Sequence, residues 1–423
     1  MRPFRGGATG IGTGIDEALL NATYRRYRGP AGAAAIRLHV RDNRFYVSFD
    51  NDRDERMCMS GGASVNAPPP NRRPHATSDL ARWKQMVGLL QALTCDVALP
   101  DLDLILYFQD TATDSQVPKQ QHDAAPASSP WPIFLFQKQQ QQTGLLLPYY
   151  SHLAHHTASV QRGARAHPWK RKRSTLFWRG GTTGGQYTLQ NWRNYTRSRL
   201  VQICQSPESN NFCDAAFYTY VQMDDQTRAE MQSHLRTKKA VPIAKQFRYK
   251  YLASLDGNGP CAGRLEKFLF GNSVIFKETS PHIEFYYSGM EPNVHYLPIA
   301  SDMSDLLQQY RYAVSHDDEM RRIVENMQSF AKSQLSFGSM ACYVRELLTE
   351  YSQLLNYTLK PVAELGDHVR MLFPSYPHAG RQCRNPIYNC HHRKRGGLKD
   401  GVFAFEDKDL DYNSTRWCYE WPG

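Results

Sequence analysis

Two glycine-rich segments combine small residues with arginine in a pattern suited to binding phosphate. They are WRGGTTGG at residues 178–185 and DGNGPCAGR at residues 256–264. Small residues let backbone N–H groups approach phosphate oxygens, and the dipole of a following helix favours an anion, while arginine adds a bidentate contact. Neither segment has the Gly-Lys-Ser/Thr ending of a P-loop. Together they suggest a diphosphate in a cleft between two α/β halves, although either alone could be an ordinary βα turn.

Three carboxylates lie in or next to one strongly apolar segment, residues 102–108. Asp110 lies just beyond its end, where open α/β sheets gather ligand-binding groups. A carboxylate there could act as a general base or simply form a turn, and the sequence leaves both open. Asp101 and Asp103 form a D-x-D pair of the kind that holds a divalent metal in some sugar transferases. Strand alternation alone places both on one face, so we expect no metal site.

A cluster of Cys and His near the C-terminus offers a second possible metal site. It consists of Cys383, Cys390, His391, His392 and Cys418. Its spacing matches no standard zinc pattern, so a disulfide between Cys383 and either Cys390 or Cys418 is the favoured interpretation. The net charge of +11 suits an anionic partner, but no recognition motif for nucleic acid accompanies it.

The elements that must position these residues alternate between strands and helices. Residues 36–40 and 44–49 predict a β-hairpin, and residues 251–276 predict a strand–helix–strand unit. The pattern of residues 304–357 predicts two long helices. The short glutamine tract at 139–142 predicts a surface insertion. Further strands are expected at 102–108, 145–148 and 174–179, and a basic helix at 193–203. The pattern predicts an α/β fold with parallel sheets.

Composition and sequons limit the class of protein. With 423 residues, 41% of them hydrophobic and 22% charged, the chain is neither disordered nor fibrous, and it suggests two to three domains at roughly 150 residues each. No apolar run could span a membrane and no signal peptide is visible. Acceptor sequons at Asn21, Asn194, Asn356 and Asn413 nevertheless indicate the secretory pathway. A missing N-terminal segment would reconcile these observations.

One block of the sequence, residues 250–298, resembles a known family. It contains KYLASLDG at 250–257, GRL at 263–265, GNSVIFK at 271–277 and VHYLP at 294–298. The block resembles glycosyltransferase family 90, which includes Rumi-type protein O-glucosyltransferases and capsule-associated xylosyltransferases. The resemblance covers roughly residues 3–357, with PFRGG at 3–7 and FWRG at 177–180 among its motifs.

This resemblance implies a GT-B architecture, with two Rossmann-like domains facing a cleft. Residues 1–165 would form the acceptor-side domain that carries the base, and residues 166–357 the nucleotide-sugar domain with closing helices. Residues 358–423 would be a basic tail outside the match. The implied activity is inverting and metal-independent: glucose or xylose moves from a UDP-sugar to a hydroxyl of a protein Ser or a glycan in the secretory pathway. The UDP-sugar is a substrate, and no cofactor is implied.

The resemblance also assigns residues. Asp110 aligns with the catalytic base, Arg197 with a donor-binding arginine, and Arg264 with the arginine that closes the donor loop. Further UDP-sugar contacts are implied at Gly181, Thr182, Gly259, Cys261, Ala262, Gly263, Pro148 and Glu284. The glucosyltransferases have a serine where this chain has Gly181, and residues 182–185 resemble the xylosyltransferase branch. The donor sugar therefore stays open.

Two further expectations follow from the resemblance. A catalytically inactive member, acting as a glycan- or protein-binding module, is the alternative to an enzyme, and the presence of Asp110 and both arginines favours the enzyme. In the family a disulfide ties the cysteine at Cys342 to one just upstream of the Pro-Phe-Arg-Gly segment, which here begins at Pro3. We therefore expect Cys342 to have no partner in this chain, and the true N-terminus to be missing.

Overall fold

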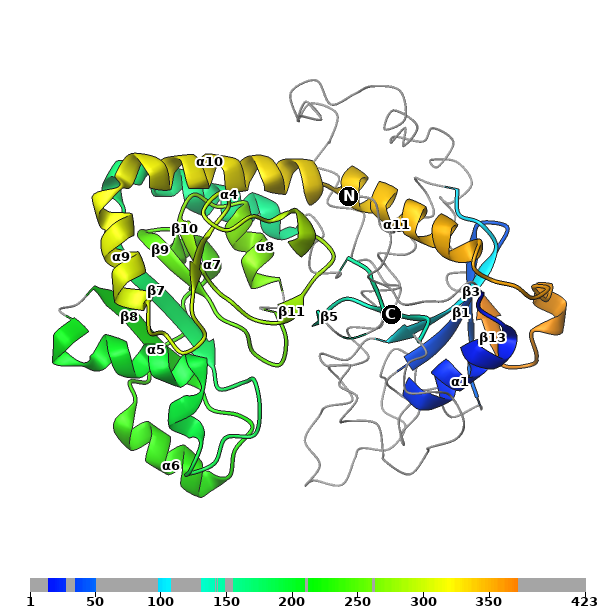
Figure 1. Cartoon of the computed structure of the whole chain (residues 1–423), viewed down its shortest axis with the longest axis horizontal. Coiled ribbons are helices and arrows are strands. Elements are labelled where there is room, and N and C mark those ends of the chain that lie inside the picture. The colour runs from blue at the N-terminus through cyan, green and yellow to red at the C-terminus, as the bar shows by residue number, and fades with distance from the viewer. Residues whose placement is uncertain are drawn as a thin grey trace, which may run out of the picture.

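The computed structural model describes residues 14–27, 35–50, 98–107, 131–140, 142, 144–148, 155–209, 212–260 and 263–371. The described strands form two main sheets, and each sheet has its own hydrophobic core (Figure 1). The fold is mixed α/β, as the sequence predicts. Asp110, Cys261, Ala262 and the Cys/His cluster at 383–418 lie outside the described residues.

The first sheet belongs to the N-terminal half and has the strand order β13-β2-β1-β3-β4-β6. Its strands are β1 (Ala35–Arg41), β2 (Arg44–Ser48), β3 (Leu102–Tyr107), β4 (Ile133–Leu135), β6 (Leu145–Leu146) and β13 (Val369–Met371). β13, β2, β1 and β3 pair antiparallel, so the parallel pairing expected from the sequence is limited here to β3, β4 and β6. Helix α1 (Glu17–Tyr27) packs beside β1 and β3.

The predicted hairpin is confirmed, and its turn chemistry explains its register. Asp42 and Asn43, with φ of 48° and 60°, both occupy the left-handed region, as a two-residue type I′ turn between twisted strands requires. The turn aligns Arg41 with Arg44 and Leu38 with Val47. β13 then adds to the free edge of β2, so the residues expected to begin a loop-like tail include a strand of this sheet.

The second sheet is entirely parallel, with the order β12-β10-β9-β7-β8. Its strands are β7 (Arg173–Gly181), β8 (Cys213–Thr219), β9 (Tyr249–Ser254), β10 (Val274–Glu278) and β12 (Leu297–Ile299). Numbered within this half, the order is 2-1-3-4-5, that of a doubly wound sheet whose topology switches between β7 and β9. The predicted strand–helix–strand unit is confirmed as β9, α8 (Arg264–Leu269) and β10.

Helices flank this sheet and connect the two halves. They are α4 (His155–Ala166), α5 (Thr196–Gln205), α6 (Asp225–His234), α7 (Ile243–Gln246), α9 (Leu306–Ser315), α10 (Asp317–Gln334) and α11 (Phe337–Ser352). Residues 304–357 thus form three helices, not the two predicted. Ser336 caps α11 by accepting from the Ser339 N–H. α10 runs along the second sheet, whereas α11 packs on the first (Figure 1).

A two-stranded ribbon lies between the two halves. β5 (Lys138–Gln139) pairs antiparallel with β11 (His282–Ile283), and the Gln140 N–H donates to Pro281 O at 2.7 Å (Figure 1). Gln139 was expected in a surface insertion, and that expectation is wrong. Two-residue strands carry no periodicity that a sequence pattern could detect.

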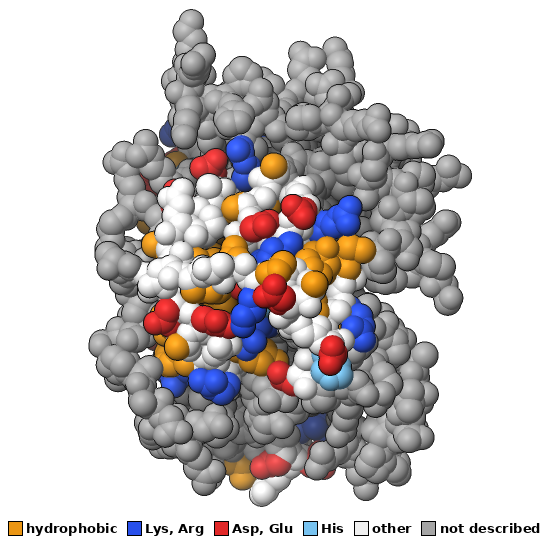
Figure 2. Space-filling view, turned by 90° about the vertical axis from the view of Figure 1, so that its right-hand side faces the viewer, with side chains coloured by type: hydrophobic (Ala, Val, Ile, Leu, Met, Phe, Trp, Pro, Cys, Tyr) orange, Lys and Arg blue, Asp and Glu red, His pale blue; other side chains and the backbone are white. Residues whose placement is uncertain are grey.

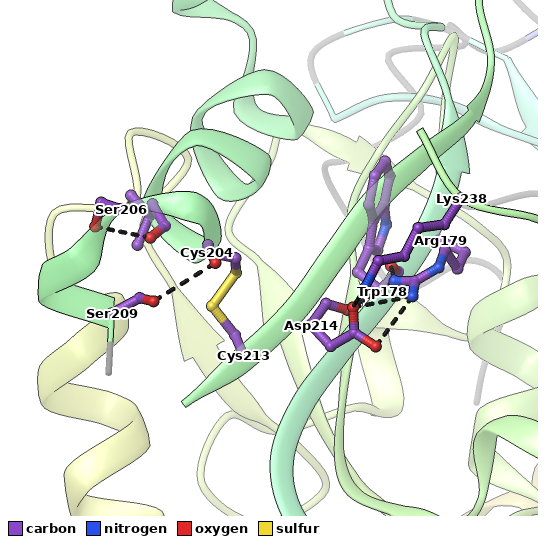
Figure 3. The surroundings of a disulfide bond; sticks show 9 residues. Trp178, Arg179, Cys204, Ser206, Ser209, Cys213, Asp214 and Lys238 are labelled. Carbon is purple, nitrogen blue, oxygen red and sulfur yellow. Dashed lines mark hydrogen bonds and ion pairs between the residues drawn. A yellow bond between two sulfur atoms is a disulfide. The ribbon is translucent and has the colours of Figure 1, made fainter. Parts of the chain in front are cut away.

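The cysteines add one correction. Cys204 and Cys213 form a disulfide that joins the end of α5 to the start of β8, with Cα atoms 5.3 Å apart (Figure 3). Cys342 is also disulfide-bonded, so the expectation that it has no partner in this chain is wrong. The face in Figure 2 intersperses acidic and basic side chains, so the positive net charge is not gathered there. Within the described part of the chain, no helix could cross a bilayer.

Candidate functional site

A cavity of about 190 Å³ opens at the carboxyl ends of β7, β9 and β10. Fourteen residues line it: Thr183, Gly184, Tyr187, Tyr195, Thr196, Arg197, Asp256, Gly257, Glu278, Thr279, Ser280, Pro281, His282 and Ser301. Parallel sheets of this order bind ligands at the point where the topology switches, here between β7 and β9. The cavity borders that point, and it contains residues from both glycine-rich segments.

Arg197 holds the two glycine-rich segments together. From α5, its Nη1 donates to Gly181 O at 2.8 Å and to Thr183 Oγ1 at 2.7 Å. Its Nε donates to Asp256 O at 2.8 Å, and its Nη2 to Leu255 O at 3.1 Å. Both segments follow strands of the same sheet, which corrects the expectation that they lie on two separate halves.

Glu278 closes one wall of the cavity at the end of β10. Its carboxylate is buried, with Oε1 accepting from Thr196 Oγ1 and Oε2 accepting from the Asp256 N–H, both at 2.8 Å. Burial raises the pKa of Glu278, and the neighbouring charge of Asp256 raises it further. Sequence reasoning missed this residue, although its place at the end of an apolar strand was a usable signal.

Asp256 and His282 form a hydrogen-bonded pair in the same cavity. Asp256 Oδ2 lies 3.0 Å from His282 Nδ1 and also accepts from Ser280 Oγ. Since a carboxylate only accepts, Nδ1 carries the proton and Nε2 is the second ring nitrogen. The side chains of His282 and Asp256 are 23% and 13% exposed. Neither His282 nor Ser280 was predicted as a site residue.

An aromatic pair forms a further wall. The rings of Tyr187 and Tyr195 stack, with centroids 3.9 Å apart and an angle of 21° between their planes. Tyr187 OH donates to Thr183 O at 3.2 Å, and Tyr195 OH donates to Gln186 O at 3.1 Å. Burial raises the pKa of both hydroxyls, which therefore stay neutral at physiological pH.

Several residues predicted at the site lie beside the cavity. Gly181 ends β7, and a Cβ there would come within 2.7 Å of Thr219 Cγ2. Thr182 is buried, and its hydroxyl donates to Val221 O and accepts from the Val221 N–H. Arg179 of the same segment turns away to form a salt bridge with Asp214 of β8 at 2.9 Å, close to Lys238 (Figure 3).

The second glycine-rich segment leads into α8. Gly263 caps this helix with φ of 68°, a left-handed conformation that favours glycine. Arg264 follows, and its buried Nη1 has no partner among the described residues. A Cβ on Gly259 would collide with Gln137, so the N-terminal half packs directly on this segment. Pro148 and Glu284 are buried and lie outside the lining of the cavity.

The D-x-D pair serves the N-terminal sheet. Asp103 Oδ1 lies 2.7 Å from both His39 Nδ1 and Arg41 Nη2, and Oδ2 accepts from Tyr357 OH at 3.0 Å. Burial alone would raise the pKa of Asp103, but His39 and Arg41 outweigh it and hold the pKa below its usual value. Asp101 accepts from the Asp42 N–H at 2.9 Å. Both carboxylates thus bind protein groups.

Comparison with known proteins places this geometry in a family. The chain is 28% identical to Protein O-glucosyltransferase 2 of Danio rerio over 281 residues, covering 64% of this chain and 51% of that protein. It is 25% identical to human Protein O-glucosyltransferase 1 over 280 residues, covering 62% and 64%. The chain thus spans about half to two thirds of the length of these relatives. The model of Glycosyl transferase family 90 matches residues 74–369, which include the whole cavity. The chain belongs to glycosyltransferase family 90.

Proposed function

We propose that this chain is an inverting, metal-independent glycosyltransferase that moves glucose or xylose from a UDP-sugar to a hydroxyl of a protein or glycan. The observation that carries the proposal is the cavity at the carboxyl ends of β7, β9 and β10, which both glycine-rich segments help to line. A cavity in this position suits a nucleotide whose diphosphate lies near the two glycine-rich segments. The names of the relatives support a protein acceptor and glucose as one candidate sugar.

The lining of the cavity suits the parts of a UDP-sugar. The partly exposed ring of Tyr195, stacked on the buried ring of Tyr187, offers a flat surface for the uracil ring. Arg264 is not a lining residue, but its Nη1, buried without a partner among the described residues, offers a charged hydrogen-bond donor for the diphosphate at the end of the second glycine-rich segment. Arg197 fixes the backbone of both segments, so their N–H groups are positioned before the donor binds.

The proposed reaction is a single displacement at the anomeric carbon. The acceptor oxygen forms the new bond to C1 as the bond from C1 to the β-phosphate oxygen breaks, and that electron pair stays on the phosphate. Asp110 takes the acceptor proton as general base. UDP is a good leaving group, so no general acid is needed. We further propose that the halves form a GT-B pair and that the enzyme works in the secretory pathway, as the sequons suggest.

Release of UDP from a panel of UDP-sugars without acceptor tests this function. The full chain should hydrolyse UDP-glucose or UDP-xylose faster than UDP-galactose or UDP-N-acetylglucosamine, and EDTA should not change the rate. A requirement for manganese would contradict the metal-independent mechanism. UDP binding without release of UDP from any donor, with or without candidate acceptors, would indicate the inactive binding module instead.

A further inference from the structure

We propose that His282, oriented by Asp256, binds the diphosphate of the donor and stabilises the negative charge that the leaving UDP gains. This inference rests on the proposed function, because it assumes that the cavity binds a nucleoside diphosphate sugar. It assigns the contact to a residue of β11 that neither composition nor motif singles out.

The geometry leaves one ring nitrogen of His282 available to a ligand. His282 lines the cavity, and its Nδ1 is held by Asp256 Oδ2 at 3.0 Å. Ser280 Oγ donates to the same carboxylate oxygen and also accepts from the His282 N–H at 3.2 Å, so side chain and backbone are fixed together. Nε2 has no partner among the described residues. A carboxylate on Nδ1 with Nε2 open is the arrangement by which proteins orient a reactive imidazole.

The charges of the lining residues favour such a group, in addition to Arg264, which lies outside the lining. Asp256 and Glu278 both carry carboxyl groups in the wall, and an anionic ligand beside them would be repelled. Of the described lining residues, only Arg197 and His282 can carry a positive charge. Arg197 already donates from Nε, Nη1 and Nη2 to groups of the two segments. A protonated His282 cancels the charge of Asp256 and presents an N–H to the ligand.

The ribbon between the two halves fixes the position of this imidazole. His282 pairs with Gln139 of β5, and the adjacent Pro281 accepts from the Gln140 N–H at 2.7 Å. The leaving-group contact is therefore set where the N-terminal half meets the nucleotide half (Figure 1). A hydrogen-bond donor that is held rigidly before the reaction stabilises developing charge with little reorganisation of the protein.

The step requires no additional proton transfer. When the bond from C1 to the β-phosphate oxygen breaks, the electron pair remains on that oxygen and the diphosphate gains one negative charge. His282 takes this role as the imidazolium, which carries a proton on each ring nitrogen before the donor binds. Its Nε2–H donates a hydrogen bond to a diphosphate oxygen throughout, and this hydrogen bond strengthens as charge develops. The proton of the acceptor hydroxyl goes to the general base.

Affinities of the full chain for uridine and for UDP, measured by calorimetry at one pH, test the assignment. His282→Gln should weaken UDP binding by roughly 10- to 100-fold, the range expected for a charge-assisted hydrogen bond, and leave uridine binding unchanged. His316→Gln is the matched control, because His316 is an exposed histidine next to an aspartate, Asp317, but does not line the cavity. Asp317 accepts from Lys250 Nζ of β9 at 2.8 Å. Asp256→Asn should weaken UDP binding too, but add little to His282→Gln in the double variant, because both act through one contact.

The possible outcomes distinguish failure of the His282 assignment from failure of the proposed function. If His282→Gln keeps the UDP-to-uridine affinity ratio of His316→Gln, the diphosphate contact is wrong while the proposed function stands. An equal loss of affinity for both ligands would show a structural role and would also overturn the assignment. If the unmodified chain binds neither UDP nor a UDP-sugar, the proposed donor class fails, and the role of His282 fails with it.

Discussion

Glu278 accepts a hydrogen bond from the main-chain N–H of Asp256 at 2.8 Å, and this contact joins the ends of the adjacent strands β10 and β9. The other oxygen of Glu278 accepts from Thr196 of α5. One buried carboxylate thus connects three walls of the cavity. Burial and the charge of Asp256 oppose ionisation of this carboxyl and raise its pKa, whereas the two hydrogen bonds favour the charged form.

The first prediction concerns the pH dependence that Glu278 gives to folding. Its pKa is raised in the folded state, so above the unfolded pKa, near 4.5, the folded chain binds more protons than the unfolded chain. The contribution of Glu278 to the free energy of unfolding is therefore fully present below pH 4.5, and it falls as pH rises through the raised pKa. Glu278→Gln should remove this fall. Urea unfolding of both proteins between pH 4.5 and 7 measures the difference, and parallel curves would contradict it.

The second prediction concerns a buried amine at the opposite end of the same sheet. Lys172 Nζ donates to Phe247 O and, at 3.0 Å, to Ser273 Oγ. Burial, with a smaller effect of Lys250, lowers the pKa of Lys172 to about 7 from its ordinary 10.5. Between these values the unfolded chain binds more protons, so the free energy of unfolding should rise with pH. Lys172→Met should flatten this rise between pH 7 and 10, whereas Lys332→Met, at an exposed position, should not.

The third prediction tests the proposed base. Asp110→Asn should lower the rate of sugar transfer by about 10²–10⁴-fold, because the acceptor proton loses its carboxylate. UDP affinity should stay nearly unchanged, since the carboxylate acts on the acceptor. Steady-state kinetics and calorimetry on the same preparation measure both quantities. Transfer at the unmodified rate would remove Asp110 from the mechanism.

The fourth prediction separates two arginines that the family resemblance treats alike. Arg264→Ala should weaken UDP binding by about 1.5–3 kcal/mol, the strength of a charge-assisted hydrogen bond, with little change in thermal stability. Arg197→Ala should lower both UDP affinity and the melting temperature, because it removes the donors that join Gly181 to Asp256. Calorimetry measures the UDP affinity of both variants, and thermal unfolding measures their melting temperatures. Equal melting temperatures of the two variants would contradict the proposal that Arg197 holds the two glycine-rich segments together.

The sequence predicts the parallel sheet well but only part of the site. Apolar runs at β9 and β10 and the glycines between them are local signals, so the strand–helix–strand unit is confirmed. His282 and Glu278 meet Asp256 only because parallel strands end at one edge, and no motif spacing encodes that meeting. The ribbon of β5 and β11 depends on contact between two halves, and so does the packing of Gln137 on Gly259. Such long-range contacts lie beyond a pattern read along one chain.

The last prediction concerns the choice of donor sugar at Gly181. The family resemblance places a serine of the glucosyltransferases at this position, whereas here a Cβ would come within 2.7 Å of Thr219 Cγ2. Gly181→Ser alone should therefore cost about 1–3 kcal/mol of stability through overpacking. Thr219→Ser removes that methyl group and keeps the hydroxyl, so the double variant should recover the stability. It should also hydrolyse UDP-glucose faster relative to UDP-xylose than the unmodified chain does. Thr219→Ser alone is the control and should leave this ratio unchanged. A double variant that is stable and has an unchanged ratio would show that Gly181 does not select the sugar.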